Sequence, residues 1–282
     1  MKIDIKNAGL VAKLCGGTVI SAAVVFFAWK RFKKPTKTDY PRDTVIHHQI
    51  GRGPYAPSMT PFAIKLETYL RMAKIPYLNI HDSRRSKKGK LTWIEYNGEE
   101  IADSEFCIEY LNEKLGIHLD KQFSSQDRGI ARAFQKMLEE NTYWTIALDR
   151  WVYDEKAPAM KFLKIPTFFR VFGKWYMQRI GYTVGMGRHS PDEVYHIMDL
   201  DLKALSDYLG KKKFLLGECP CQEDCAVFGQ LSTFYWHAFG TRAETIFKKY
   251  TNLCDYCERM KDTFWPDWDD CNTKGGTQEA RK

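Results

Sequence analysis

Two hydroxyl side chains, Ser58 and Thr60, stand where a loop becomes an amphipathic helix in the stretch APSMTPFAIKLET, residues 56–68. The N–H groups and the positive end of a helix favour an anion, so a hydroxyl placed there could donate to a thiolate and lower the pKa of that thiol. Thr followed by Pro is also a common helix start, with Thr60 as N-cap and Pro61 at the first helical position. The two interpretations are compatible, and the sequence leaves both open.

Six of the eight cysteines lie beyond residue 218, and five of them could supply soft thiolate ligands for zinc or cadmium. Their spacing is not that of two matched CxxC knuckles, and the stretch LCDYC lies in apolar and aromatic company that suits core cysteines or a helix face. A metal cofactor is therefore not expected, and a cysteine-based metal site is kept as an alternative. Its ligands would come from Cys219, Cys221, Cys225, Cys254 and Cys257.

The composition predicts a globular body of two domains, because 282 residues exceed one typical domain and 44% of them are hydrophobic. The net charge of +8 comes from 43 basic and 35 acidic residues. Part of the excess lies in two short clusters, around residues 30–37 and in RRSKKGK at 84–90. This is local charge and not an extended basic stripe, so no nucleic-acid partner is expected.

The N-terminal segment has the composition of a membrane anchor. Leu14 to Trp29 contains no charged residue, and with the apolar residues before Lys13 the segment is about 19 residues long, near the length that spans a bilayer. It ends in large aromatic side chains and a basic cluster, unlike a cleaved signal peptide. We expect residues 1–38 to form an uncleaved anchor, with a helix at about 11–29, and a basic linker. A buried helix is the alternative.

The basic cluster after the segment indicates a single-pass protein with a cytosolic body. The sequence does not distinguish the mitochondrial outer membrane, the endoplasmic reticulum and the lysosome.

Residues 39–120 show the order of elements βαβ-ββα. TVIHHQI and IPYLNIHD have the pattern of strands, a helix follows Thr60, and TWIEYNGEEIAD predicts a hairpin that turns at Asn97-Gly98. Asp103 then opens a second helix. These elements must position Thr60 and the residues near Asp103.

Residues 121–265 predict an all-helical domain. Apolar residues recur at helical intervals in 126–152, 191–209, 224–239 and 241–262. The 156–188 region, with two prolines and several glycines, predicts a broken helix or a long connection. Residues 266–282 are expected to form a frayed polar tail.

Three segments resemble the failed axon connections family of glutathione S-transferase-like proteins, which includes cadmium-responsive proteins of nematodes and is related to the metaxins. They are GRGPYAPSMTPFAIKLET, GKLTWIEYNGEEIADSEFCIEYLNEKLG and FWPDWDD. The resemblance covers roughly residues 44–265. It implies a fold of class α/β plus all-α, in which an N-terminal thioredoxin-like domain precedes a glutathione-transferase-type helical C-terminal domain, here behind a transmembrane anchor.

The resemblance implies roles for particular residues. Thr60 takes the position of the reactive Ser or Cys, with Ser58 as the fallback hydroxyl. Asp103 and Ser104 match the acidic residue and Ser that hold the γ-glutamyl end of glutathione, although an N-cap with an acidic first turn is the simpler interpretation. The electrophile pocket would be lined by Tyr143 and Trp144.

Two positions depart from the family's pattern. Thr92 stands where the family has a cis-proline, and Thr92 and Trp93 are the residues there that could contact glutathione. A cis bond before a non-proline residue costs about 2.5–4 kcal/mol, so we expect a trans Leu91–Thr92 peptide and question the affinity for glutathione. In the helical domain, Cys221 replaces the Ser or Thr of the capping box that ends at Asp224.

These features define competing functions. The first is a membrane-anchored protein that binds glutathione or a related thiol, with glutathione as cosubstrate, and conjugates electrophiles in a stress or heavy-metal response. The second is a non-enzymatic, metaxin-like adaptor at an organelle membrane or in axon development, acting through a homodimer or a protein partner. The third is the cysteine-based metal-binding protein.

Overall fold

The computed structural model describes residues 40–282, apart from 83, 157 and 164–168. Residues 41–282 form one compact unit. The predicted anchor, residues 1–38 with its helix at about 11–29, lies outside the described residues. Within the described part of the chain, no helix combines the length and the apolar composition needed to cross a membrane.

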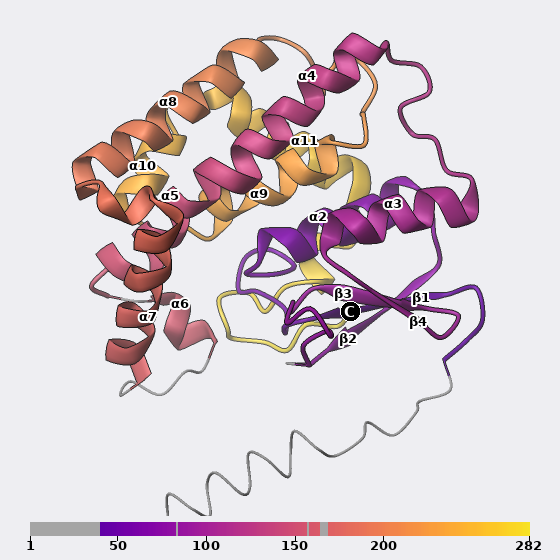
Figure 1. Ribbon diagram of the computed structural model, residues 1–282, viewed down its shortest axis with the longest axis horizontal. Coiled ribbons are helices and arrows are strands. Elements are labelled where there is room, and N and C mark those ends of the chain that lie inside the picture. The colour runs from indigo at the N-terminus through magenta and orange to yellow at the C-terminus, as the bar shows by residue number, and fades with distance from the viewer. Residues whose placement is uncertain (1–39, 83, 157, 164–168) are drawn as a thin grey trace, which may run out of the picture. The chain divides into compact units, whose positions relative to one another are not determined.

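A four-stranded sheet of order β2-β1-β3-β4 forms the centre of the N-terminal domain (Figure 1). Its strands are β1 (Val45–Gln49), β2 (Tyr77–His81), β3 (Trp93–Tyr96) and β4 (Glu99–Ala102). β1 is parallel to β2 and antiparallel to β3, and β3 is antiparallel to β4. The predicted thioredoxin-like order of elements is confirmed.

The β3–β4 hairpin turns at the predicted residues. Asn97 and Gly98 have φ angles of 49° and 87°, and a two-residue hairpin turn with positive φ at both positions favours this pair. The turn fixes the register that pairs Trp93 with Ala102, so the strand ends just before Asp103.

Two helices, α2 (Pro61–Met72) and α3 (Ser104–Leu115), pack against the sheet through a hydrophobic cluster that includes Val45, Leu66 and Leu111 (Figure 1). In the chain between β2 and β3, the Arg84 guanidinium lies 4.5 Å from the centre of the Trp93 ring.

The second domain is helical, and Figure 1 shows α4, α8, α9 and α11 above the sheet domain, with α7 at its lower edge. π-helical turns η1 (Met137–Thr142) and η2 (Asp149–Tyr153) interrupt its first long helical segment. The remaining elements are α4 (Ser125–Lys136), α5 (Tyr143–Leu148), α6 (Pro158–Phe162), α7 (Phe169–Val184), η3 (Met186–Arg188), α8 (Pro191–Leu209), α9 (Asp224–Trp236), α10 (Arg242–Phe247), α11 (Thr251–Phe264) and η4 (Trp268–Asp270).

Two expectations from the sequence are wrong in detail. The segment 241–262 forms two helices, α10 and α11, where the sequence predicted one. The sequence does not reveal the break, because residues on both sides of it face the same cluster and keep the helical periodicity. The end of the chain is not frayed: Cys271 is buried, and the amides of Thr273 and Gly275 donate to the carbonyls of Gly53 and Pro54. The aromatic and apolar residues of 264–271 pack this segment against the body.

The two domains share a helix contact at the start of α2. A Cβ atom added at Gly229 of α9 would lie 2.5 Å from the Pro61 carbonyl oxygen, so only glycine permits this approach. The largest hydrophobic cluster also includes Ala56 and Ile64 from the N-terminal domain. All residues of the three hydrophobic clusters lie between Val45 and Cys271, so residues 41–282 contain the whole described core.

Candidate functional site

A cavity of about 240 Å³ lies where the starts of α2 and α3 meet the residues before β3. We call it the Thr60 cavity. It brings together five residues that the sequence singled out: Thr60, Thr92, Asp103, Ser104 and Tyr143. The other lining residues are Phe62, Arg85, Gly89, Lys90 and Leu91. Since small-molecule pockets are typically about 300–1,000 Å³, this cavity has room for part of a tripeptide.

Thr60 occupies the N-cap position of α2, and Pro61 follows at the first helical position. The position is the one predicted, but the Thr60 side chain makes no capping hydrogen bond. The Thr60 hydroxyl therefore does not satisfy a backbone N–H group of α2. Thr60 lines the cavity at the positive end of this helix.

Asp103 caps α3 in an unusual backbone conformation. Its φ of 76° is uncommon for a residue other than glycine, and such strain costs about 1–3 kcal/mol. Its side chain accepts from the Glu105 amide and pairs with Lys90, Nζ to Oδ2 2.8 Å. Partial burial opposes the charge of Asp103, but the Lys90 hydrogen bond and charge outweigh it and lower the pKa of the carboxyl. The carboxylate is ionised at neutral pH.

The lining residues can bind a small ligand that carries both a positive and a negative charge. Arg85 and Lys90 offer cations and Asp103 an anion, while hydroxyl groups stand at Thr60, Thr92, Ser104 and Tyr143. Ser104 lies in the first turn of α3, where free backbone N–H groups favour a carboxylate. The sequence analysis did not predict Arg85 or Phe62 as lining residues. The basic cluster at 84–90 was the signal that could have pointed to Arg85.

A buried ion network holds the two helix starts in place. The Lys65 ammonium of α2 contacts Glu105 Oε2 of α3 at 2.5 Å and Glu139 Oε1 of η1 at 2.7 Å. Gln135 of α4 donates to the same Glu105 oxygen at 2.6 Å. Burial opposes the charge of Lys65, but the two carboxylates outweigh it and raise the pKa above its ordinary value. Both domains thereby fix α2 against α3.

The loop before Thr60 is anchored from the helical domain. Arg150 of η2 is buried and donates to the carbonyl oxygens of Met59 and His237, both at 3.1 Å. His237 Nε2 accepts from the amides of Tyr55 and Ala56. Burial and the Arg150 charge keep the pKa of His237 well below its ordinary value, so the ring is neutral and can accept these bonds. The helical domain thus fixes the position of the loop that leads into α2.

Tyr143 reaches the cavity from the junction of η1 and α5, and its ring lies 5.2 Å from the ring of Phe62. Burial raises the pKa of the Tyr143 phenol, against the opposing charges of Arg150 and Lys90. The phenol is therefore protonated at neutral pH and can donate a hydrogen bond.

Three of the candidate residues do not line the cavity. Ser58 is buried, and its Oγ accepts from the Thr60 amide. Trp93 stacks on His48 with ring centres 3.9 Å apart. Trp144 packs against the cluster of Leu148 and Val152.

The Leu91–Thr92 peptide is trans, as are all the peptides between described residues. Thr92 lines the cavity, and the peptide before it differs from the cis-proline peptide that the resemblance implies. The expectation of a trans bond is confirmed.

The cysteines within residues 40–282 do not gather into a metal site. In the described part of the chain, no group of three or more His, Cys, Asp or Glu side chains could hold a metal ion. The five candidate ligands are free thiols that belong to no such group: Cys219, Cys221, Cys225, Cys254 and Cys257.

The capping interaction at the start of α9 is made by Asp224. Its carboxylate accepts from the Cys221 amide at 2.8 Å, the Leu215 amide at 2.9 Å and the Tyr256 hydroxyl at 2.6 Å. The replacement of Ser or Thr by Cys221 therefore leaves the acidic half of the capping box in place. Burial raises the pKa of Asp224, and these hydrogen bonds oppose the rise.

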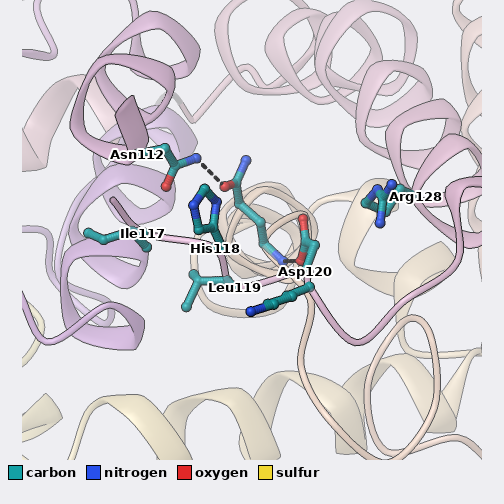
Figure 2. A pocket seen from close by; sticks show the side chains of 8 residues that line it. Asn112, Ile117, His118, Leu119, Asp120 and Arg128 are labelled. Carbon is teal, nitrogen blue, oxygen red and sulfur yellow. Dashed lines mark hydrogen bonds between the residues drawn. The ribbon is translucent and has the colours of Figure 1, made fainter. Parts of the chain in front are cut away.

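A second hollow, of about 470 Å³, lies beyond the end of α3 (Figure 2). There Asn112 Nδ2 donates to Gln222 Oε1 at 2.7 Å. The backbone N–H of Gln222 donates to Asp120 Oδ1 at 2.6 Å. These bonds tie α3 to the residues that precede α9. The hollow is a seam between the domains and contains none of the residues that the sequence singled out for chemistry.

Comparison with known proteins places the chain in a family. Residues 61–156 match the glutathione S-transferase N-terminal domain and residues 198–260 match the glutathione S-transferase C-terminal domain. The chain is 30% identical over 220 residues to isoprene-epoxide–glutathione S-transferase of Rhodococcus sp. (strain AD45), covering 73% of this chain and 92% of that one. The chain belongs to the glutathione S-transferase family.

Within this family the chain is similar to Failed axon connections of Drosophila melanogaster and to the metaxins. It is 35% identical to the former over 260 residues, which are 84% of this chain and 62% of that protein's length. It is 20% identical to Metaxin-2 of Mus musculus over 81% of this chain and 91% of that protein. The predicted resemblance to these proteins is confirmed.

Solved structures share the fold. The β-etherase LigF of Sphingobium sp. strain SYK-6 aligns with a TM-score of 0.56 at 18% identity, over 77% of this chain and 94% of that one. A glutathione S-transferase of Methylobacterium radiotolerans in complex with glutathione sulfonate aligns with a TM-score of 0.53 at 13% identity, over 77% and 90%. The thioredoxin-like domain followed by a helical domain is the architecture of this family.

Proposed function

We propose that the protein binds glutathione or a related thiol in the Thr60 cavity. The observation that carries the proposal is the meeting of Thr60, Thr92, Asp103, Ser104 and Tyr143 in one cavity, with a Thr60 hydroxyl that does not cap its own helix. A relative named for glutathione transfer and a solved structure in complex with glutathione sulfonate support the choice of ligand.

Each group has a role in this proposal. The Thr60 hydroxyl donates to the ligand's thiolate, and the positive end of α2 favours the same charge. At the other end of the cavity, Ser104 and the free N–H groups of α3 bind the γ-glutamyl carboxylate, and Asp103 accepts from the α-amino group. Arg85 and Lys90 line the wall and add positive potential for an anionic peptide.

The reaction in this proposal is addition of the thiolate to an electrophilic carbon. For an epoxide, the class named in one relative, a carbon–sulfur bond forms as a carbon–oxygen bond breaks, and the electron pair stays on the oxygen. Tyr143 remains protonated and donates a hydrogen bond to that oxygen, which takes its proton from water. Tyr143 thus forms the electrophile side of the cavity.

Calorimetry of residues 41–282 with reduced glutathione tests the proposal. We expect saturable binding that Thr60→Ala weakens by about tenfold or more, since a hydrogen bond to a charged group contributes about 1.5–3 kcal/mol. The matched control is Thr263→Ala, at an exposed position on α11 outside the cavity, which should bind like the parent. Absence of binding at millimolar glutathione would overturn the proposal.

A non-enzymatic adaptor is the second candidate, favoured by the trans Leu91–Thr92 peptide and by the similarity to the metaxins. In this case the same fold presents a surface to a protein partner or to a second copy. Proximity labelling with the full chain and its Thr60→Ala variant separates the two. Partners that are retained in full by the variant, together with a lack of glutathione binding, would favour the adaptor.

The proposal includes an anchor at residues 1–38, with a single helix at about 11–29 and the body on the cytosolic side. It rests on the uncharged Leu14–Trp29 stretch and the basic cluster that follows it. Alkaline extraction of membranes from cells that express the full chain should leave it in the membrane fraction, and residues 41–282 should be released. Imaging of the full chain then identifies the membrane.

A further inference from the structure

Helix α7 is apolar on the side that faces the body of the helical domain. Gly173 and Gly181 lie on this side: a Cβ atom added at Gly173 would be 2.9 Å from Met160 Cε, and one at Gly181 would be 2.8 Å from Leu148 Cδ2. Met177, between them, packs against the cluster that contains Leu148. This inner side is closely packed, and it accounts for the place of α7 in the fold.

The outer side of α7 is also apolar, and it is exposed. Phe172, Trp175, Tyr176 and Tyr182 are 61%, 54%, 53% and 60% exposed. Intervals of three and four residues place side chains on one face of a helix, and the Phe172 ring lies 5.8 Å from that of Trp175 and 6.4 Å from that of Tyr176. With Arg179, these residues form what we call the α7 outer face. Figure 1 shows α7 at the edge of the domain.

A helix that is apolar on both sides is expected to be covered on both sides. Contiguous exposed aromatic side chains on a folded protein mark a surface that meets a protein or a membrane. The charge around the face indicates which of the two it meets.

The sequence around α7 carries only positive charge. From Lys156 to Pro191 it has seven Lys or Arg residues and no Asp or Glu. Among the described residues, no carboxylate forms an ion pair with Arg170, Lys174, Arg179 or Arg188. Arg179 and Arg188 adjoin the aromatic rings, so the α7 outer face is suited to an anionic surface.

A shallow hollow of about 520 Å³ lies along the face, next to the aromatic rings. Arg179 and Arg188 line it together with Trp175, Tyr182 and Thr183, and the Arg188 guanidinium lies 5.1 Å from the centre of the Tyr182 ring. A guanidinium binds phosphate oxygens through two parallel hydrogen bonds. The hollow therefore offers two such groups at the level of the rings.

We propose that the α7 outer face binds the surface of a bilayer that contains anionic phospholipids. The aromatic rings enter the boundary between headgroups and acyl chains, where Trp and Tyr are enriched. The hollow at Arg179 and Arg188 takes a headgroup phosphate. Apolar and aromatic residues next to basic ones are the composition of helices that lie in the membrane interface. The inference does not depend on the proposed anchor or on glutathione binding.

Vesicle sedimentation of residues 41–282 tests the inference, because this unit contains the whole described core and lacks the segment proposed to be an anchor. We expect it to sediment with vesicles of phosphatidylcholine mixed with phosphatidylserine, weakly with phosphatidylcholine alone, and less as salt is raised. The double variant Arg179→Gln/Arg188→Gln should bind about thirtyfold more weakly, from about 1 kcal/mol per basic residue near an anionic surface. The matched control Lys211→Gln/Lys249→Gln removes two exposed charges elsewhere and should bind like the parent.

Fluorescence quenching by brominated phospholipids provides a second measurement. Quenching should fall in Trp175→Phe, because Trp175 is the tryptophan on the proposed face. Equal loss of sedimentation in both double variants, or equal binding to both kinds of vesicle, would overturn the inference. So would a dimer of residues 41–282 that becomes monomeric in Trp175→Ser and does not bind vesicles, since the face would then join two copies of this chain.

Discussion

Glu67 lies in the middle of α2, two residues after Lys65, and its side chain is 1% exposed. Its two oxygens accept from Arg52 Nη1 at 2.7 Å and Nη2 at 3.0 Å. Gln49, Asn79 and Tyr77 donate to the same carboxylate at 3.0, 3.0 and 3.2 Å. Replacing Glu67 with Gln nearly preserves the volume but removes the charge and turns one of the two acceptor oxygens into a donor. The substitution therefore tests the ion pair together with its hydrogen bonds.

The magnitude follows from the pKa of this carboxyl. Burial alone would raise it, but the charge and hydrogen bonds of Arg52 outweigh burial and lower the pKa of Glu67 from 4.5 to about 2. A carboxyl whose pKa is lowered on folding stabilises the folded state above its unfolded pKa and loses this effect as the pH falls towards the folded one. The contribution is about 3 kcal/mol at pH 7 and about 1 kcal/mol at pH 3. Removing one partner of a buried ion pair typically costs about 3–5 kcal/mol, which agrees.

Urea unfolding of residues 41–282, followed by circular dichroism at several pH values, measures this contribution. We expect Glu67→Gln to lower the free energy of unfolding by about 3 kcal/mol at pH 7 and by about 1 kcal/mol at pH 3. Glu109→Gln, at an exposed position on α3, is the control and should change stability by less than about 0.5 kcal/mol. A cost below about 1 kcal/mol at pH 7, or one that does not change with pH, would contradict the lowered pKa of Glu67.

Three further predictions concern the contacts that hold the site together. Gly229→Ala places a Cβ atom 2.5 Å from the Pro61 carbonyl oxygen, so thermal unfolding should show a loss of about 1–3 kcal/mol. Arg150→Met leaves two buried carbonyl groups without their donor, and limited proteolysis should cut the loop before α2 faster than in the parent. Tyr256→Phe removes the hydroxyl that donates to the buried Asp224 carboxylate, and urea unfolding should show a loss of about 1.5–3 kcal/mol. An unchanged midpoint or cleavage rate would contradict the corresponding contact.

The elements that depend on local chemistry could be predicted from the sequence. Asn97-Gly98 predicts the hairpin because few other pairs adopt positive φ twice in succession, and Thr60-Pro61 predicts the start of α2 because proline suits the first helical position. The break between α10 and α11 could not be predicted in this way. The apolar period continues across it, since both helices face one cluster.

The candidate site was predicted in part. Thr60, Asp103 and Ser104 carry a local signal, because each stands at a helix start, and the structure brings them to one cavity. Ser58 has the same chemistry two residues away, yet it is buried beneath the Thr60 amide. Arg85 carries no local signal that separates it from its basic neighbours, and only the path of the chain between β2 and β3 brings it to the cavity.

Residue types at short intervals are enough to predict the order of strands and helices and the places where α2 and α3 begin. They also define the uncharged N-terminal stretch. The packing of the fold decides that the Thr60 hydroxyl is not used as a cap, that the cysteines do not gather in the described part of the chain, and that α7 presents aromatic rings outward. These properties depend on which surfaces meet across the fold. Burial, charge and close approach between residues far apart in the chain select among the roles that local sequence permits.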